Sequence, residues 1–162
     1  MSAKRRRLLC LLWLAVIGTA AMIFAFSAQT GEDSAKTSGN VTAFLLRLFT
    51  RDFDSLPEAE QAALQERCGL LVRKGAHFTE FALLAFWVRL LLHFYRARNG
   101  FFRAWAAAAL YAATDEAHQL LIAERAGQFQ DILIDSAGAL LGALLACALL
   151  GLRKKHDAGG EE

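Results

Sequence analysis

The residues best suited to chemistry in this chain form three polar clusters, each near the end of an apolar segment. The first is the pentad from Asp115 to Gln119, which contains two acids, a histidine and an amide. The second runs from Arg73 to Glu80, and the third consists of Asp131 and Asp135. Ionisable side chains at membrane depth are costly and commonly functional. These clusters are therefore the candidate functional residues.

Helical spacing divides the pentad between two faces. Asp115, His118 and Gln119 are separated by three and four residues, the spacing of neighbours on one helix face. Glu116 is rotated by about 100° from Asp115, so it must address a different neighbour.

The other two clusters also follow helical spacing. His77 and Glu80 are three residues apart and share a face. One stripe of the last apolar segment carries Asp131, Asp135, Gly138 and Gly142. The two glycines form a Gly-x-x-x-Gly pair, which permits close approach of another helix. We therefore expect the aspartates of this stripe to point into a helix bundle.

Three kinds of site fit these residue types. Paired histidines and carboxylates on facing helices resemble the ligands of metal sites in bundles. The alternative is general acid–base chemistry, with His118 or His77 as the base and a carboxylate orienting it. A non-catalytic ion-pair network that fixes helix packing or binds a headgroup is the third. Whether a metal or another cofactor binds stays open.

The candidate residues can be grouped by role. The candidate catalytic residues, which include the ligands of the metal alternative, are His77, Glu80, Asp115, Glu116, His118 and Asp135. An anionic ligand such as a phosphate would be held by basic side chains. The candidate ligand-binding residues from the clusters and the following loop are Arg73, Lys74, Gln119, Arg125 and Asp131.

Four apolar segments position these clusters. The chain is 56% hydrophobic, above the roughly 45–50% of soluble domains. The segments lie near residues 8–26, 76–95, 104–122 and 132–152, and each has about the 20 residues that cross a bilayer as a helix. Only helices satisfy the backbone of such segments in lipid. We predict an all-α, polytopic membrane protein, with a transmembrane domain over residues 1–152 and a tail over residues 153–162.

The segment between the first two spans also has a helical pattern. Apolar residues recur with helical spacing at Val41, Phe44, Leu45, Leu48 and Phe49, which predicts an amphipathic helix on the outer leaflet or against the bundle. Ser55 and Glu58, around Pro57, indicate the start of a second amphipathic helix. This helix could continue into the transmembrane helix after Gly75. We expect both helices to cover the outer surface of the bundle.

The distribution of positive charge predicts the orientation. Basic residues flank the apolar segments at positions 4–7, 96–103 and 153–155, so the positive-inside rule places both termini in the cytoplasm. Residues 27–75 and 123–130 then lie outside, and the three clusters meet at similar depth in the outer part of the membrane. The first segment exceeds the roughly 7–15 apolar residues of a signal peptide, so we expect an uncleaved anchor, with a cleaved signal peptide as the alternative.

Taken together, these motifs resemble the VanZ-like family of small bacterial membrane proteins, over roughly residues 26–142. The resemblance is carried by Phe26 to Gln29 with Gly31, Ser34 and Ser38, by Arg73 to Phe81, by the pentad with Arg125, and by Asp131 to Asp135 with Gly138 and Gly142. It adds Ser27 and Gln29 to the candidate ligand-binding residues. The chain departs from the family at Ala123-Glu124, where a Pro-Gly turn is common.

The resemblance implies a setting in the bacterial cell envelope. We expect a multi-pass protein of the cytoplasmic membrane whose outward-facing polar site binds a lipid-linked or anionic ligand. Since one family member is linked to teicoplanin resistance, the resemblance extends this expectation to glycopeptide susceptibility. The alternative is a membrane-embedded enzyme that uses His/carboxylate or metal-assisted chemistry on an envelope lipid. The expected partners are membrane lipids and a lipid-linked or glycopeptide ligand, with no nucleic acid; the oligomeric state stays open.

Overall fold

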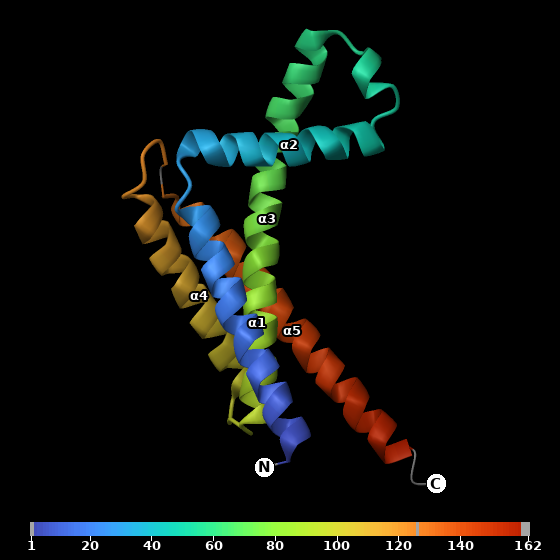
Figure 1. The fold of residues 1–162 in the computed structure, drawn as a ribbon, viewed down its shortest axis with the longest axis vertical. Coiled ribbons are helices and arrows are strands. Elements are labelled where there is room, and N and C mark those ends of the chain that lie inside the picture. The colour runs from blue at the N-terminus through green and yellow to red at the C-terminus, as the bar shows by residue number, and fades with distance from the viewer. Residues whose placement is uncertain (1, 126, 160–162) are drawn as a thin grey trace.

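The computed structural model describes residues 2–125 and 127–159. Its elements are α1 (Ala3–Ser27), α2 (Gly31–Phe49), the short 3-10 helix η1 (Phe53–Ser55), α3 (Glu58–Phe94), α4 (Gly100–Gln119) and α5 (Phe129–Gly159). No strand occurs among these described residues, so the predicted all-α class is confirmed. Helices α1, α3, α4 and α5 form a bundle, and α2 lies across one end of it (Figure 1).

Three of the described helices, α1, α3 and α5, are long and apolar enough to cross a membrane. Helix α4 has 20 residues but carries Arg103, Asp115 and Glu116, and it is not among the three. The chain is thus consistent with a membrane protein. The fourth span stays a prediction, because the polar pentad itself makes α4 less apolar than its neighbours.

Helix α3 is longer than the predicted span. It begins at Glu58 and continues without a break through Gly75 to Phe94. At 1.5 Å per residue it is about 55 Å long, well beyond the roughly 30 Å of a hydrocarbon core, and its first turns project past α2 (Figure 1). The capping box expected at Ser55 is not formed, because the hydroxyl donates instead to the backbone oxygen of Asp52.

The other boundaries shift by a few residues. Helix α4 ends at Gln119 rather than near residue 122, and α5 begins at Phe129. Helix α5 also extends to Gly159, so most of the predicted tail continues this helix, while residues 160–162 lie outside the described residues.

Helix α2 contacts α3 through a different face from the one expected. Ser34, Thr42 and Leu46 are buried, whereas the predicted apolar stripe is exposed, with Phe44 and Leu48 each 63% accessible. This stripe therefore does not pack against α3, and its alternative placement on the outer leaflet stays a prediction. The face that packs on α3 is richer in hydroxyl groups, which are satisfied locally: the Thr42 side chain donates to the backbone oxygen of Ser38.

Helices α3 and α5 form the most extensive pair in the bundle. A Cβ atom added to Gly138 would clash with the backbone oxygen of Phe78, and one added to Gly142 with that of Ala82. The predicted Gly-x-x-x-Gly contact is confirmed, and its partner is α3. Beside the larger Ile23, Phe81 and Leu84, the core also contains small residues on α4 and α5, namely Ala104, Ala108, Ala112, Ala139 and Ala143.

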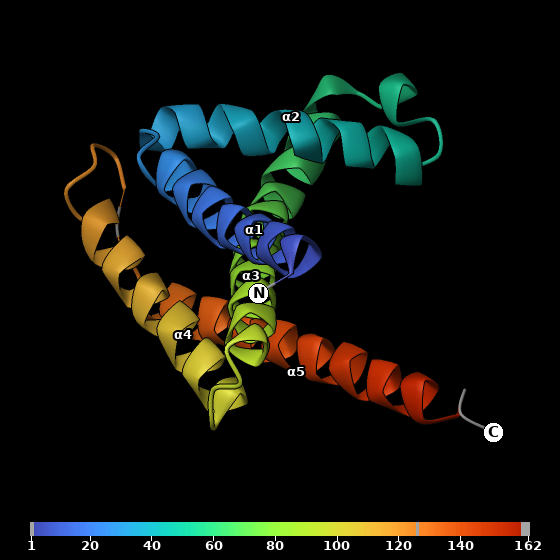
Figure 2. The ribbon, with the colours of Figure 1, turned by 60° about the horizontal axis from the view of Figure 1, so that its bottom comes forward.

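The two ends of the bundle differ. At one end the start of α1 meets the end of α3, where the Arg5 guanidinium lies over the Phe94 ring and Trp13 donates to the Tyr95 hydroxyl. Figures 1 and 2 show α2 crossing at the opposite end, where α4 connects to α5. The three polar clusters lie at this second end.

Candidate functional site

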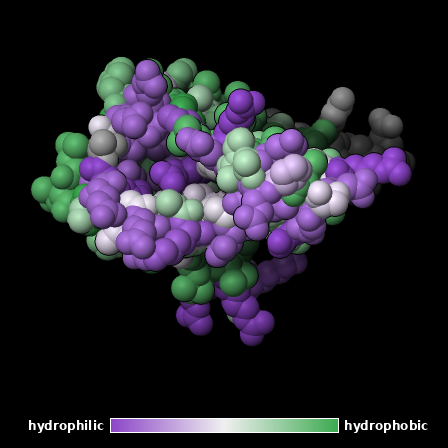
Figure 3. All heavy atoms as spheres, turned by 90° about the horizontal axis from the view of Figure 1, so that it is seen from above, coloured by the Kyte–Doolittle hydropathy of each residue, from purple (hydrophilic) through white to green (hydrophobic). Residues whose placement is uncertain are grey.

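A polar cavity of about 270 Å³ opens between α3, α5 and the α4–α5 connection. Its walls include His77 from α3, Gln119 from α4, and Asp131 and Asp135 from α5. The cavity therefore brings together one or more residues of each of the three predicted clusters. Figure 3, which looks down on this end, shows hydrophilic side chains gathered around a recess.

A second cavity of about 190 Å³ lies between the end of α1, α2 and α3. Its walls include the predicted site residues Gln29 and Glu80 together with apolar side chains. Arg73, His77 and Arg125 line both cavities. The second cavity and the polar cavity are therefore neighbours that share one wall of nitrogen donors.

The two arginines of this shared wall have few partners. Arg73 makes one long hydrogen bond, 3.5 Å from Nη2 to Ser38 Oγ, and Arg125 Nη2 donates to the backbone oxygen of Phe26 at 3.1 Å. Among the described residues neither Nε has a hydrogen-bond partner, and neither guanidinium forms an ion pair. Burial, and then the nearby Arg73 charge, lower the pKa of Arg125 below its ordinary value, while Asp115 and Glu116 act in the opposite direction.

The third basic residue of the predicted anion site is already neutralised. Lys74 Nζ lies 2.5 Å from Asp131 Oδ1, with 35% and 28% of the two side chains exposed. This ion pair joins α3 to α5 at the wall of the polar cavity. Lys74 and Asp131 therefore link two walls of the cavity. The positive charges of these walls without an ionic partner among the described residues are those of Arg73 and Arg125.

The two acids of the pentad are buried and serve different neighbours, as helical phase predicts. Asp115 Oδ2 accepts a hydrogen bond from Gln119 Nε2 at 3.0 Å. Glu116 Oε2 accepts one from the backbone N–H of Gln128 at 2.9 Å, which ties α4 to the residue before α5. Neither acid lines a cavity, but Asp115 is near enough to interact electrostatically with His77 and Glu80. Both acids therefore lie outside the walls of the two cavities.

Six of the described side chains contain a buried polar atom without a hydrogen-bond partner, and besides the two arginines these include Asp135 and His77. Asp135 is fully buried, and neither of its oxygens has a hydrogen-bond partner among the described residues. Nδ1 of His77 also has no hydrogen-bond partner among the described residues. Unsatisfied buried polar atoms are rare and require an explanation. Asp135 and His77 both line the polar cavity, where a bound group can satisfy them, whereas Ser27 Oγ and His118 Nδ1 are equally unpartnered and line neither cavity.

His118 does not join the other candidates in the cavities. Its ring packs on Phe24 of α1, with centroids 4.9 Å apart. Helical phase permits this separation, because positions three and four residues after Asp115 lie about 60° and 40° to opposite sides of it, and the neighbouring helices decide where each side chain packs. Gln119 therefore turns towards the polar cavity, while His118 turns towards α1. Ser27, which is fully buried, also lines neither cavity.

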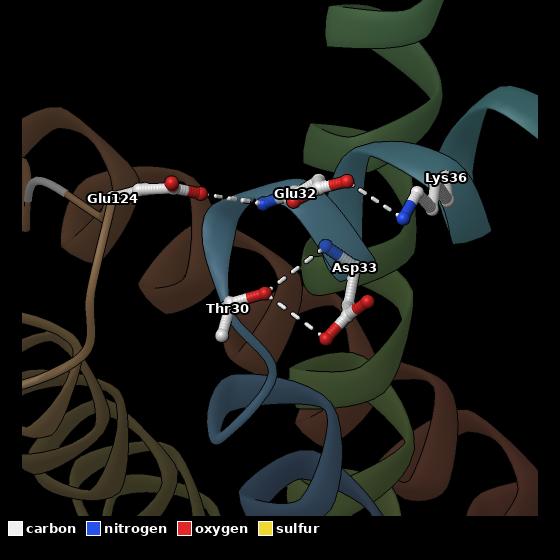
Figure 4. A network of polar contacts seen from close by, with 5 residues as sticks. All are labelled: Thr30, Glu32, Asp33, Lys36 and Glu124. Carbon is white, nitrogen blue, oxygen red and sulfur yellow. Dashed lines mark hydrogen bonds and ion pairs between the residues drawn. The ribbon is translucent and has the colours of Figure 1, made fainter.

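Sequence reasoning missed two polar residues of the polar cavity, Glu124 and Gln128. Both belong to the α4–α5 connection, in which Glu124 was noted only as a departure from a Pro-Gly turn. Its carboxylate accepts a hydrogen bond from the backbone N–H of Glu32 at the start of α2 (Figure 4). No local pattern signals such a contact, because the two residues are 92 positions apart.

This geometry suits anion binding better than metal binding. Among the described residues, no group of three or more His, Cys, Asp or Glu side chains is placed to hold a metal ion. The metal alternative therefore has no support from the arrangement. What the two cavities offer is a pair of guanidinium groups, which match phosphate and carboxylate geometry, next to one histidine able to transfer a proton.

Comparison with known proteins agrees with these observations. The sequence model of the VanZ/LLP1 family matches residues 10–150, most of the chain. The searches of curated proteins and of solved structures found no match to this chain. The chain therefore belongs to the VanZ/LLP1 family and is a VanZ-like membrane protein.

Proposed function

We propose that this protein binds a lipid-linked, anionic ligand at the α2 end of its helix bundle. The observation that carries the proposal is the shared wall of the two cavities. Arg73 and Arg125 line both, and neither has an ionic partner among the described residues. Two guanidinium groups held close together repel each other, and an anion between them relieves that repulsion.

We further propose that the site faces outward from the bacterial cytoplasmic membrane, with four transmembrane helices and both termini in the cytoplasm. The positive-inside rule supports this orientation. The first turns of α1, which contain the basic residues at positions 4–7, and the α3–α4 connection lie at the end of the bundle opposite to the site (Figure 1).

Lipid binding by purified protein tests the proposal. The protein is transferred to a neutral detergent and incubated with phosphatidylglycerol or with a zwitterionic lipid, and the bound lipid is counted by native mass spectrometry. Arg73→Gln and Arg125→Gln should each weaken binding of the anionic lipid about tenfold, since hydrogen bonds to charged groups contribute about 1.5–3 kcal/mol. Arg67→Gln is the matched control, because Arg67 is exposed on α3 and lines neither cavity. Equal binding by all three variants would refute the proposal.

The effect on glycopeptide susceptibility follows as a finer proposal. Binding an anionic precursor lipid at the outer leaflet would change its supply to cell-wall synthesis, on which glycopeptides act. Expression of the protein in a susceptible bacterium should then raise the inhibitory concentration of teicoplanin. Arg125→Gln, expressed to the same level, should abolish that rise.

One observation favours an enzymatic alternative. His77 lines both cavities, its Nδ1 has no partner among the described residues, and the Asp115 charge acts on it. A histidine so placed can act as a general base on a bound lipid phosphate or a neighbouring water. His77→Gln should then abolish product formation from an envelope lipid extract while the anionic lipid still binds. Unchanged lipid composition with the wild-type protein would remove this alternative.

A further inference from the structure

We infer that the ligand is a small-headgroup lipid phosphate that occupies both cavities at once. The phosphate lies on the wall formed by Arg73 and Arg125, the rest of the headgroup in the polar cavity, and the hydrocarbon chain in the second cavity. This inference rests on the proposed function and adds the chemical class of the ligand and its orientation.

The phosphate position follows from charge. In the polar cavity, Lys74 is paired with Asp131. The carboxylate of Glu124 in the same cavity accepts a backbone hydrogen bond from α2. The cationic groups without a carboxylate partner among the described residues are Arg73 and Arg125, which also line the second cavity. An anion held there is at the boundary between the two cavities, so substituents on it can extend into both.

The chain position follows from the apolar side chains of the second cavity. Phe26, Val41, Val72 and Ala76 line it, and they come from three different helices. Phe26 and Val41 are 40% and 46% exposed, so they offer apolar surface beside the polar residues that also line this cavity. In a bilayer such apolar surface faces hydrocarbon, and a lipid chain can enter along it without crossing water.

The size of the polar cavity limits the headgroup. Its volume of about 270 Å³ is at or below the roughly 300–1,000 Å³ of pockets for small molecules. A phosphate with a small substituent fits, whereas a glycopeptide antibiotic does not. We therefore place any effect on teicoplanin susceptibility downstream of lipid binding, with the antibiotic itself outside the site.

The test compares three probes on the full-length protein in neutral detergent: a long-chain isoprenyl monophosphate, the matching isoprenyl alcohol and inorganic phosphate. The monophosphate should bind at least tenfold more tightly than either of the others. Ala76→Phe, which fills the second cavity, should weaken the monophosphate at least tenfold and leave inorganic phosphate unchanged. Ala117→Phe is the control, since Ala117 is exposed on α4 and lines neither cavity. Val41→Trp is a second filling variant, should Ala76→Phe not fold.

The outcomes separate this inference from the proposed function. Inorganic phosphate binding as tightly as the lipid, with no effect of the filling variants, would overturn the lipid assignment but keep an anion site. Binding of the monophosphate that is insensitive to both Arg73→Gln and Arg125→Gln would overturn the anion site as well. Competition by teicoplanin for the bound monophosphate would overturn the exclusion of the antibiotic.

Discussion

The carboxylate of Glu124 accepts a hydrogen bond from the backbone N–H of Glu32, at 3.2 Å, and so joins the α4–α5 connection to the first turn of α2 (Figure 4). A backbone hydrogen bond from Gly31 to Ala123, at 3.1 Å, lies beside it. Glycine is required at position 31, because a side chain there would clash with the backbone of Glu124. Gly31 and Glu124 both line the polar cavity, so this contact closes part of its rim.

The same contact explains how a departure from the family's turn is accommodated. Glu124 has a φ of 61°, in the left-handed region that costs a residue with a side chain about 1–2 kcal/mol. A glycine here would avoid that cost. The glutamate offsets it, because a carboxylate at a helix N-terminus satisfies a free N–H group and interacts favourably with the helix dipole.

Substitutions at Glu124 should separate these two contributions. Glu124→Ala loses the hydrogen bond and keeps the strained backbone, so we expect it to lower stability by about 1 kcal/mol. Glu124→Gly loses the bond but relieves the strain, so its stability should stay near that of the wild type. Thermal unfolding in one detergent measures both. An alanine variant as stable as the glycine variant would show that the backbone at this position is not strained.

The glycines of α5 predict a strong dependence of stability on side-chain size. Gly138→Ala places a methyl group against the backbone of α3, and overpacking of this kind costs about 1–3 kcal/mol. Gly151→Ala is the control, since nothing lies within 4 Å of its added Cβ and alanine favours a helix over glycine by about 1 kcal/mol. The unfolding midpoint should fall for the first and stay equal or rise for the second.

The ion pair between Lys74 and Asp131 should contribute measurable coupling. Both side chains are largely shielded from solvent, so the pair should exceed the few tenths of a kcal/mol of exposed pairs and reach about 1 kcal/mol. A double-mutant cycle with Lys74→Gln and Asp131→Asn measures it through unfolding. Strictly additive effects of the two substitutions would show that the pair contributes nothing beyond its separate members.

The two histidines of the predicted site should differ in their effect on binding. His77 lines both cavities, whereas His118 packs on Phe24. We expect His77→Gln to weaken binding of the anionic lipid several-fold and His118→Gln to leave it unchanged. His118→Gln should instead lower the unfolding midpoint, because it removes an aromatic contact between α4 and α1. Weaker lipid binding by His118→Gln, with unchanged binding by His77→Gln, would instead assign the ligand contact to His118.

The orientation can be tested by cysteine labelling. In a variant without Cys10, Cys68 and Cys147, a cysteine at position 125 should react with a membrane-impermeant reagent in intact cells. A cysteine at position 98 should react only after the membrane is opened. Since these positions lie on either side of α4, this pair also tests whether α4 crosses the membrane. Labelling of both from the outside would exclude the fourth span.

The sequence alone was sufficient for the helical class and the stripe of close approach on α5. These depend on local periodicity and on the length of apolar runs, which are properties of a few neighbouring residues. The meeting of the three polar clusters could also be predicted, because each lies at a similar depth from a helix end. The face of α2 that packs on the bundle could not be predicted, because an apolar stripe can lie against either a membrane or another helix.

Tertiary structure alone decided which members of the clusters share a cavity. His118 and Gln119 are adjacent in sequence, and only the positions of α1 and α5 around α4 send one to Phe24 and the other to the polar cavity. Likewise, Arg73 of α3 and Arg125 line the same cavities, in a structure where the α4–α5 connection is hydrogen-bonded to the first turn of α2. Contacts across so many residues depend on helix crossings and loop conformation, which local sequence patterns do not encode.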